Sequence, residues 1–318
     1  MIYILGIDIA KAKFDVALMI NDKFLTKQFA NNAEGFDKLK SWYQAKAVDQ
    51  LHACLEATGI YGEQLARYLQ AQGHKVSVVN PARIKAFAGS KLSRNKTDSA
   101  DAKLIAQFCY EQNPAAWQAP SPELKRLQAI VRHLDVLKHT RQQQLNHLES
   151  ATEAIVVNSF QQIIAYLDKE IAELNNQIFL LFEQHPTLNR NKELLQTIPG
   201  IGKLTAIKFL AEVPEIIHYQ SAKQLAAHLG VSPRRDESGE LKRRTRLAKI
   251  GNQRVRKALY FPAITAKNHN AMVKAFCQRL ADKGKSKMAI IGAAMHKLVH
   301  IIYGVLKHQQ PFNENLVA

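Results

Sequence analysis

Hydrophobic positions in the first third of the chain follow the two-residue period of strands and then alternate between strand and helix periods. Apolar runs at 3–9, 14–20 and 24–29, separated by short polar turns, predict three consecutive strands. The pattern then predicts a helix at 33–47, a strand at 51–56, a helix at 61–72, a strand at 75–79 and helices at 82–88 and 98–112. This alternation predicts a mixed sheet covered by helices.

The middle of the chain, from 121 to 184, changes to the heptad spacing of a coiled coil. Its main seam of apolar residues recurs at alternating intervals of four and three: Phe160, Ile164, Leu167, Ile171, Leu174, Ile178 and Leu181. A weaker seam precedes it and consists of Leu127, Val131, Leu134, Leu145, Leu148 and Ile155. The break near Val157, Asn158 and Ser159 predicts two long helices that fold back as a hairpin. We expect this arm to pair within the chain or with another subunit.

The last part of the chain begins after Pro186 and is predicted to be mainly helical. Its segment Ile-Pro-Gly-Ile-Gly at 198–202 is typical of a helix-hairpin-helix turn, because glycine permits tight backbone geometry. The N–H groups that open the following helix could meet a phosphate there, although a plain turn between helices fits equally well. The fold class is therefore α/β plus all-α, with an α/β domain at 1–118, a coiled-coil helical hairpin at 119–186 and a helical domain at 187–318.

Four acidic residues stand at the ends of predicted elements. Asp8 closes the first apolar strand, and Glu56 closes the fourth. Asp98 and Asp101 share one side of a turn at the start of the 98–112 helix. Converging carboxylates repel unless divalent cations neutralise them, and oxygen ligands suit Mg²⁺ or Mn²⁺. Each acid alone also fits a strand end or the first turn of a helix. Three strands followed by αβαβα, with acids at these places, is the order of an RNase H-like nuclease domain.

Composition adds a strong basic balance to this picture. The 318 residues include 44 Lys plus Arg against 27 Asp plus Glu, a formal net charge of +17, which favours a nucleic acid partner over an anionic membrane. The most apolar late stretch, 288–306, contains His296, Lys297 and His300, so we expect a buried helix and no membrane span. Three separated cysteines and the lack of a basic leader favour a reducing cytoplasm.

The positive charge is concentrated in two places. One cluster surrounds the acid pair and contains Arg83, Lys85, Lys91, Arg94, Lys96 and Lys103, of which Arg94 and Lys96 are predicted to bind nucleic acid. The denser cluster is also predicted to bind nucleic acid and contains Arg234, Arg235, Lys242, Arg243, Arg244, Arg246, Lys249, Arg254, Arg256 and Lys257. Cations beside carboxylates are what a metal-dependent site needs to hold a phosphate backbone.

Several motifs in one order resemble a known family over almost the whole chain. Gly-Ile-Asp-Ile-Ala-Lys at 6–11, Glu-Ala-Thr-Gly at 56–59 and Lys-Thr-Asp-Ser-Ala-Asp-Ala at 96–102 resemble the amino-terminal DEDD domain of IS110 transposases. Four further segments resemble the carboxy-terminal transposase domain of that family: Ile-Pro-Gly-Ile-Gly at 198–202, Leu-Gly-Val-Ser-Pro at 229–233, Glu-Ser-Gly at 237–239 and the segment 251–260.

The resemblance implies a DNA recombinase with a RuvC-like domain, a coiled-coil arm and a second catalytic domain. It implies that Asp8, Glu56, Asp98 and Asp101 form a metal-binding tetrad, and that Ser238 is a nucleophile that links covalently to DNA. Characterised members are guided by a structured bridge RNA read against donor and target DNA, and act as tetramers in which two subunits complete one site. The chain departs from the expected pattern after Ser238 and Gly239, where Glu240 replaces a small or basic residue.

The sequence leaves several functions open. The leading hypothesis is an RNA-guided transposase that uses Mg²⁺, acts on element ends and target DNA, and assembles as a dimer to tetramer in the bacterial cytoplasm or nucleoid. A site-specific DNA invertase similar to the pilin-gene inversion proteins shares the tetrad and the serine. A metal-dependent junction nuclease would need the tetrad alone, and a non-catalytic nucleic-acid-binding module would need neither.

Overall fold

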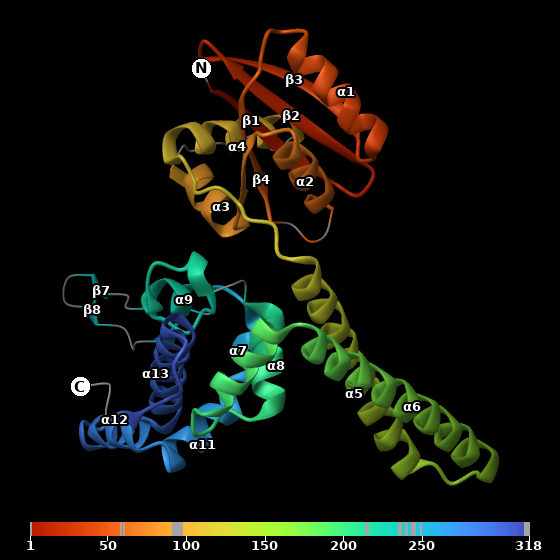
Figure 1. Cartoon of the computed structure of the whole chain (residues 1–318), viewed down its shortest axis with the longest axis vertical. Helices are drawn as coiled ribbons and strands as arrows, with labels where there is room; N and C mark the ends of the chain where they lie inside the picture. The colour runs from red at the N-terminus through yellow and green to blue at the C-terminus, as the bar shows by residue number, and fades with distance from the viewer. Residues whose placement is uncertain are drawn as a thin grey trace. The chain divides into compact units, whose positions relative to one another are not determined.

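A computed structural model of the chain forms two compact units, Met1–Ala119 and Pro120–Ala318 (Figure 1). It describes residues 2–57, 59, 61–90, 98–213, 216–234, 237–238, 241–242, 246–248 and 250–314. The first unit is a mixed α/β structure, and the second is mainly helical. The chain is thus α/β followed by helical structure, as the sequence predicts, and each unit is described by itself.

The first unit is built on a five-stranded sheet in the order β3-β2-β1-β4-β5. Its elements are β1 (Tyr3–Ile9), β2 (Lys13–Ile20), β3 (Lys23–Ala30), α1 (Ala33–Gln44), β4 (Leu51–Glu56), α2 (Glu63–Ala71), β5 (Lys75–Val79), α3 (Pro81–Ser90) and α4 (Asp98–Gln112). Strands β1, β2 and β3 form an antiparallel meander, whereas β4 runs parallel to β1 and β5 parallel to β4. The predicted strands and helices of this unit are confirmed.

Alternation along β1 divides the sheet into two differently covered faces. Leu5 and Ile7 are fully buried in one core together with Phe36 of α1 and Leu65 of α2. Gly6 lies on the opposite face, where α4 packs. A Cβ atom on Gly6 would lie 2.2 Å from the carbonyl oxygen of Ala102 and 2.3 Å from the backbone nitrogen of Ala106. Glycine therefore allows the backbone of α4 to rest directly on β1.

The second unit begins with two long antiparallel helices, α5 (Pro122–Ser150) and α6 (Ala154–Gln184) (Figure 1). The α6 seam residues Ile164, Leu167, Ile178 and Leu181 are buried, as their heptad spacing predicts. Across the hairpin, Arg141 donates to Asp168, and the ring of His147 stacks on that of Phe160 with centroids 5.8 Å apart. The predicted helical hairpin is confirmed, whereas its supercoiling stays a prediction.

The predicted position of the hairpin turn is wrong. Val157, Asn158 and Ser159 lie inside α6, and the turn is at 151–153. Ala151 leaves the helical conformation with φ −81° and ψ 131°, and the carbonyl of Glu153 accepts the first helical bond from Val157. Valine and asparagine have only modestly unfavourable helix propensities, which do not end a helix. Ile155 is 82% exposed and therefore is not part of the predicted seam.

The remaining elements of this unit follow the hairpin. They are α7 (Pro186–Gln196), α8 (Lys203–Glu212), η1 (Ile216–His218), α9 (Ala222–His228), β6 (Pro233–Arg234), β7 (Glu237–Ser238), β8 (Leu241–Lys242), β9 (Arg246–Leu247), α10 (Gln253–Ala258), α11 (Tyr260–His269), α12 (Ala271–Asp282) and α13 (Lys287–His308). Of these, α7 and α8 pack directly against the hairpin. Leu127, Val131 and Leu134 of α5 are buried in the same hydrophobic core as Leu298 and Ile302 of α13. The arm is therefore continuous with the core of this unit.

Two further predictions from the sequence concern helices of this unit. Helix α13 is long and apolar enough to cross a membrane by length and composition, but over half of its most apolar window is buried within the unit, as predicted for a core helix. The segment 198–202 does join two helices, α7 and α8. Gly200 has φ +105°. A Cβ atom added to it would lie 2.8 Å from Ala266 Cβ and 2.8 Å from the carbonyl oxygen of Pro262, both in α11. The turn is thus a packing contact, and its phosphate binding stays a prediction.

Replacing Gly6 tests the direct packing of α4 on the sheet. Gly6→Ala should lower the free energy of unfolding by about 1–3 kcal/mol or more, because its Cβ meets backbone atoms that move only if α4 moves. Gly89→Ala in α3 is the matched control, since no atom of the described residues lies within 4 Å of its added Cβ. Urea unfolding of both variants measures the difference. Equal stability of the two variants would contradict the close approach of α4 to β1.

Candidate functional site

Two of the predicted acids lie at the ends of neighbouring parallel strands. In the register of β1 and β4, Ile7 is opposite Leu55, so Asp8 and Glu56 occupy the next positions on the two strands. Asp8 is two residues from Gly6 and therefore lies on the sheet face that α4 covers. Both side chains are half-buried, and each already takes part in an interaction within the chain.

The start of α4 supplies the other two acids. Asp101 is half-buried and directly precedes Ala102, whose carbonyl oxygen faces Gly6. Asp98 is the first residue of α4, and its side chain lies outside the described residues. The backbone thus brings the four acid positions to one corner of the sheet, at the carboxyl ends of β1 and β4 under the first turns of α4.

The chemistry of these groups suits a hard divalent cation, because all are carboxylates and Mg²⁺ takes oxygen ligands. However, among the side chains that the structure describes, no three His, Cys, Asp or Glu residues form a group that could hold a metal ion. The described structure therefore supports the common location of these acids but does not test their ligation of a metal.

A further acid, Asp15, lies beside this corner and was missed in the sequence. Asp15 of β2 is directly opposite Asp8 of β1, so the two share a face of the sheet. Its carboxylate accepts hydrogen bonds of 3.1 and 3.0 Å from Gln28 Nε2 of β3. Lys13 Nζ lies 3.9 Å from Asp15 Oδ2. Asp15 stands inside a strand pattern, so only the pairing register could have shown its position.

Most of the predicted nucleic-acid-binding residues are in segments whose side chains are not described. Arg94, Lys96, Arg235, Arg243, Arg244 and Lys249 lie outside the described residues, as do the side chains of Arg234, Lys242 and Arg246. Ser238 lies in β7 opposite Leu241 of β8, but its side chain is also outside the described residues. Arg254, Arg256 and Lys257 are described, and all three lie on α10.

The start of α10 is fixed by the two residues that precede it. The Asn252 side chain caps the helix by accepting from the backbone N–H groups of Arg254, at 3.0 Å, and Val255, at 3.2 Å. Gly251 has φ +137°, and a Cβ there would lie 2.2 Å from the carbonyl oxygen of His228. The Gly-Asn pair therefore places α10 closely against the end of α9.

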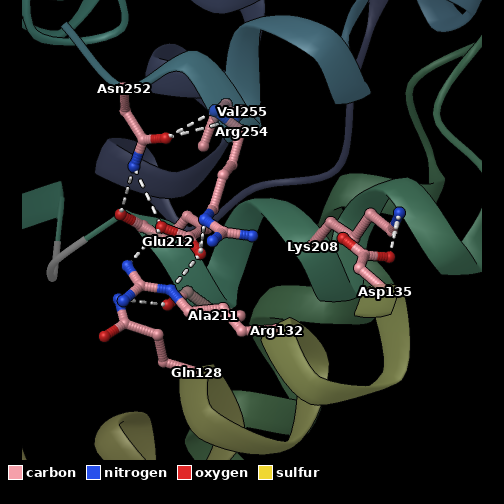
Figure 2. Close-up of polar contacts among 9 residues, drawn as sticks. All are labelled: Gln128, Arg132, Asp135, Lys208, Ala211, Glu212, Asn252, Arg254 and Val255. Carbon is pink, nitrogen blue, oxygen red and sulfur yellow. Dashed lines mark hydrogen bonds and ion pairs between the residues drawn. The ribbon is translucent and has the colours of Figure 1, made fainter. Parts of the chain in front are cut away.

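The same asparagine joins a buried carboxylate, Glu212, at the end of α8 (Figure 2). The Glu212 side chain is only 4% exposed. Its Oε1 accepts from Arg132 Nε at 2.7 Å, and its Oε2 accepts from Arg132 Nη2 at 2.9 Å and from Asn252 Nδ2 at 3.1 Å. Arg254 Nε lies 4.0 Å from Oε1. Glu212 thus links the arm helix α5, helix α8 and the basic helix α10.

Two effects on the pKa of Glu212 oppose each other. Burial alone would raise the pKa by penalising the charged form. Hydrogen bonds from Arg132 and Asn252, with the positive charges of Arg132 and Arg254, outweigh that effect, and the pKa falls below its ordinary value of 4.5. Glu212 is therefore an anion at neutral pH, and the positive charges of Arg132 and Arg254 stabilise it.

A second ion pair joins the same two helices one turn away. Lys208 Nζ on α8 lies 2.6 Å from Asp135 Oδ1 on α5 (Figure 2). Lys208 and Asp135 have no contact with α10 among the described interactions. The sequence pattern does not reveal Glu212 and Arg132 as partners, because they are single charges on helices about 80 residues apart. Only the tertiary fold brings them to Asn252.

Comparison with known families and proteins gives a consistent result. A family model of the IS110 DEDD type, described as a transposase, matches residues 5–156, and a model described as the transposase IS116/IS110/IS902 family matches residues 192–278. The pilin gene-inverting proteins of Moraxella bovis and Moraxella lacunata are each 36% identical to the chain, over 98% of both sequences. The transposase for insertion sequence element IS1111A of Coxiella burnetii is 23% identical over 98% of the chain and 91% of its own length.

Replacing Glu212 tests the buried anion. Glu212→Gln should lower the free energy of unfolding by about 1–3 kcal/mol at pH 7, since it removes the charge that Arg132 and Asn252 hold. Because the folded-state pKa is lowered, this contribution is present above the ordinary value of 4.5 and is lost as the pH falls through the folded pKa. Urea unfolding between pH 7 and 4 should therefore show a smaller difference from the wild type at the acid end.

Asp135→Asn is the control for this measurement. Asp135 is 35% exposed, so loss of its ion pair should cost less than about 1 kcal/mol. If both substitutions cost the same, or if the effect of Glu212→Gln does not diminish in acid, Glu212 is not the anion on which this junction depends.

Proposed function

Because the chain belongs to the IS110 family of transposases, we propose that it is a DNA recombinase with a serine nucleophile and a metal-binding acid tetrad. The observation that carries the proposal is the common corner of Asp8, Glu56 and the first turns of α4. The sheet order β3-β2-β1-β4-β5, with an antiparallel meander followed by parallel strands, supports an RNase H-like, RuvC-like fold for this unit. Cleaving and rejoining DNA is an activity that the family implies.

In the proposed reaction, Ser238 attacks a phosphodiester of DNA. Its Oγ forms a bond to phosphorus, the bond from phosphorus to one deoxyribose oxygen breaks, and the serine proton passes to that leaving oxygen. A second DNA hydroxyl then attacks the phosphorus and forms a new DNA phosphodiester. The bond from phosphorus to Ser238 Oγ breaks, and the hydroxyl proton passes to Oγ, which restores Ser238. Each step exchanges one phosphodiester bond for another, so rejoining needs no other co-reactant.

Asp8, Glu56, Asp98 and Asp101 would hold Mg²⁺ or Mn²⁺, which stabilises developing negative charge on phosphate oxygens when it is bound. The arginines and lysines of 234–257, including Arg254, Arg256 and Lys257 on α10, would hold the DNA backbone on either side of the reacting phosphate. The net charge of +17 supports a polyanionic ligand such as nucleic acid.

We also propose that a structured bridge RNA guides the protein and that it assembles as a dimer to tetramer in the bacterial cytoplasm. Base pairing with a guide would explain specificity without a protein code for DNA sequence. The helical hairpin of α5 and α6 offers a long surface for contact between subunits.

A second candidate function is site-specific DNA inversion. It is favoured by the pilin gene-inverting proteins, whose 36% identity over nearly the full length of both chains exceeds the 23% identity of the IS1111A transposase. Inversion and transposition share the proposed chemistry and differ in the arrangement of the DNA sites.

A covalent-trapping assay tests the proposed chemistry. The protein, expressed with its flanking RNA, is mixed with labelled flanking DNA and Mg²⁺, denatured and analysed on a gel. Ser238→Ala should abolish the protein–DNA adduct, and Asp101→Asn should reduce it by about a thousandfold or more. Asp37→Asn on α1, on the opposite face of the sheet, is the control and should form the adduct normally. Cleavage without an adduct in Ser238→Ala would instead indicate a metal-dependent junction nuclease.

The DNA products separate the two candidate functions. We expect recombination of a plasmid with the native flanking sites to require the flanking RNA and to disappear after ribonuclease treatment. Sequencing of the junctions then distinguishes an inverted segment from an excised and inserted one. Recombination at full rate without RNA would contradict the proposed guide but not the serine chemistry.

A further inference from the structure

The junction at Glu212 presents two cations around one buried anion (Figure 2). The carboxylate is 4% exposed, whereas the side chains of Arg132 and Arg254 are 41% and 54% exposed. With one negative and two positive charges, this group has a net charge of +1, and the positive charges are the ones that solvent can reach. The neighbouring pair of Lys208 and Asp135 is neutral by comparison.

The two arginines are close enough to act on one ligand group. Arg132 Nε is 2.7 Å from Glu212 Oε1, and Arg254 Nε is 4.0 Å from the same oxygen. The two Nε atoms are therefore within about 7 Å of each other, which brings the two guanidinium groups close enough for one phosphate to contact both. Arg132 uses Nε and Nη2 for Glu212. A guanidinium has five N–H donors in a rigid plane, so the opposite edge of Arg132 retains donors for a ligand.

Glu212 also restrains these cations, by direct hydrogen bonds to Arg132 and, through Asn252, by anchoring the helix that carries Arg254. Its bidentate contact holds the Arg132 guanidinium in one plane, and its bond with Asn252 anchors the first turn of α10, on which Arg254 stands. Holding a long side chain in place before binding removes part of the conformational entropy cost of the contact. The arrangement is therefore better suited to a fixed anion contact than free surface arginines would be.

We propose that Arg132 and Arg254 together bind one backbone phosphate of a nucleic acid, and that Glu212 is the positioning residue for both. The inference rests on the proposed function for the class of ligand, since DNA and RNA share this phosphate chemistry. It adds the base of the arm to the nucleic-acid surface, because Arg132 lies on α5, more than 100 residues before the basic segment. The arm would then contact nucleic acid at its base in addition to joining subunits.

Fluorescence anisotropy of the full-length protein tests this phosphate contact. Affinities for a labelled ~30-base-pair DNA duplex and for the flanking RNA are measured over a series of KCl concentrations. Arg132→Gln and Arg254→Gln should each weaken binding by about three- to tenfold and lower the slope of log K against log salt by up to about 0.9. The double variant should be weakened less than the product of the single effects, since both arginines serve one phosphate. Whether the affinity is lost for the DNA duplex or for the RNA identifies the source of the phosphate.

Lys208→Gln is the matched control for these arginine variants. It removes one positive charge and one ion pair from the same two helices, α5 and α8, and should bind within about twofold of the wild type. If Lys208→Gln loses as much affinity as Arg132→Gln, the effect belongs to helix packing, and the proposed clamp is wrong. Unchanged affinity and salt slope of Arg132→Gln with both nucleic acids would also overturn it. Failure of the wild type to bind either nucleic acid would instead contradict the proposed function itself.

Glu212→Gln tests the positioning role separately. The substitution raises the net charge by one, so a purely electrostatic effect would tighten binding to a polyanion. Loss of positioning predicts weaker binding, measured at a temperature at which circular dichroism shows the variant to be fully folded. Binding as tight as or tighter than that of the wild type would show that the arginines need no positioning by Glu212.

Discussion

The close contact between β1 and α4 is the constraint on which the first unit depends. At Gly6 the helix backbone rests directly on the strand, with no side chain between them. Because Asp8 follows on the same face and Asp101 directly precedes the contact residue Ala102, this contact also sets the distance between the acids of the strand and those of the helix. A larger residue at Gly6 would separate these groups while leaving each of them in place in the sequence.

In the second unit the main constraint is the repulsion among concentrated positive charges. Cations concentrated on a short helix such as α10 repel one another, and a helix of this length has little stability of its own. The buried Glu212 offsets part of that repulsion, and the Asn252 cap satisfies the first backbone N–H groups of α10. One acid and one amide thereby connect the basic helix to the arm.

The sequence predicts the first unit well because its strands are short, regular and separated by clear turns. Each strand from 3 to 79 follows from the period of its own apolar residues, and the acid positions follow from the ends of two strands and the start of α4. The turn of the arm could not be placed in this way, because its residues at 151–153 carry no glycine or proline signal. Asp15 and Glu212 were missed for a related reason. Their roles depend on strand register and on contacts between distant helices, which no local pattern encodes.

The two units also differ in how burial affects their charges. At the corner of the sheet the side chains of Asp8, Glu56 and Asp101 are half-buried, and acids at one such location suit a ligand of positive charge. At the junction of α5, α8 and α10 the carboxylate is buried and the guanidinium groups are exposed, which suits a ligand of negative charge. Each unit thus presents charge of one sign at its own site, and in each the arrangement depends on contacts between elements that are distant in the sequence.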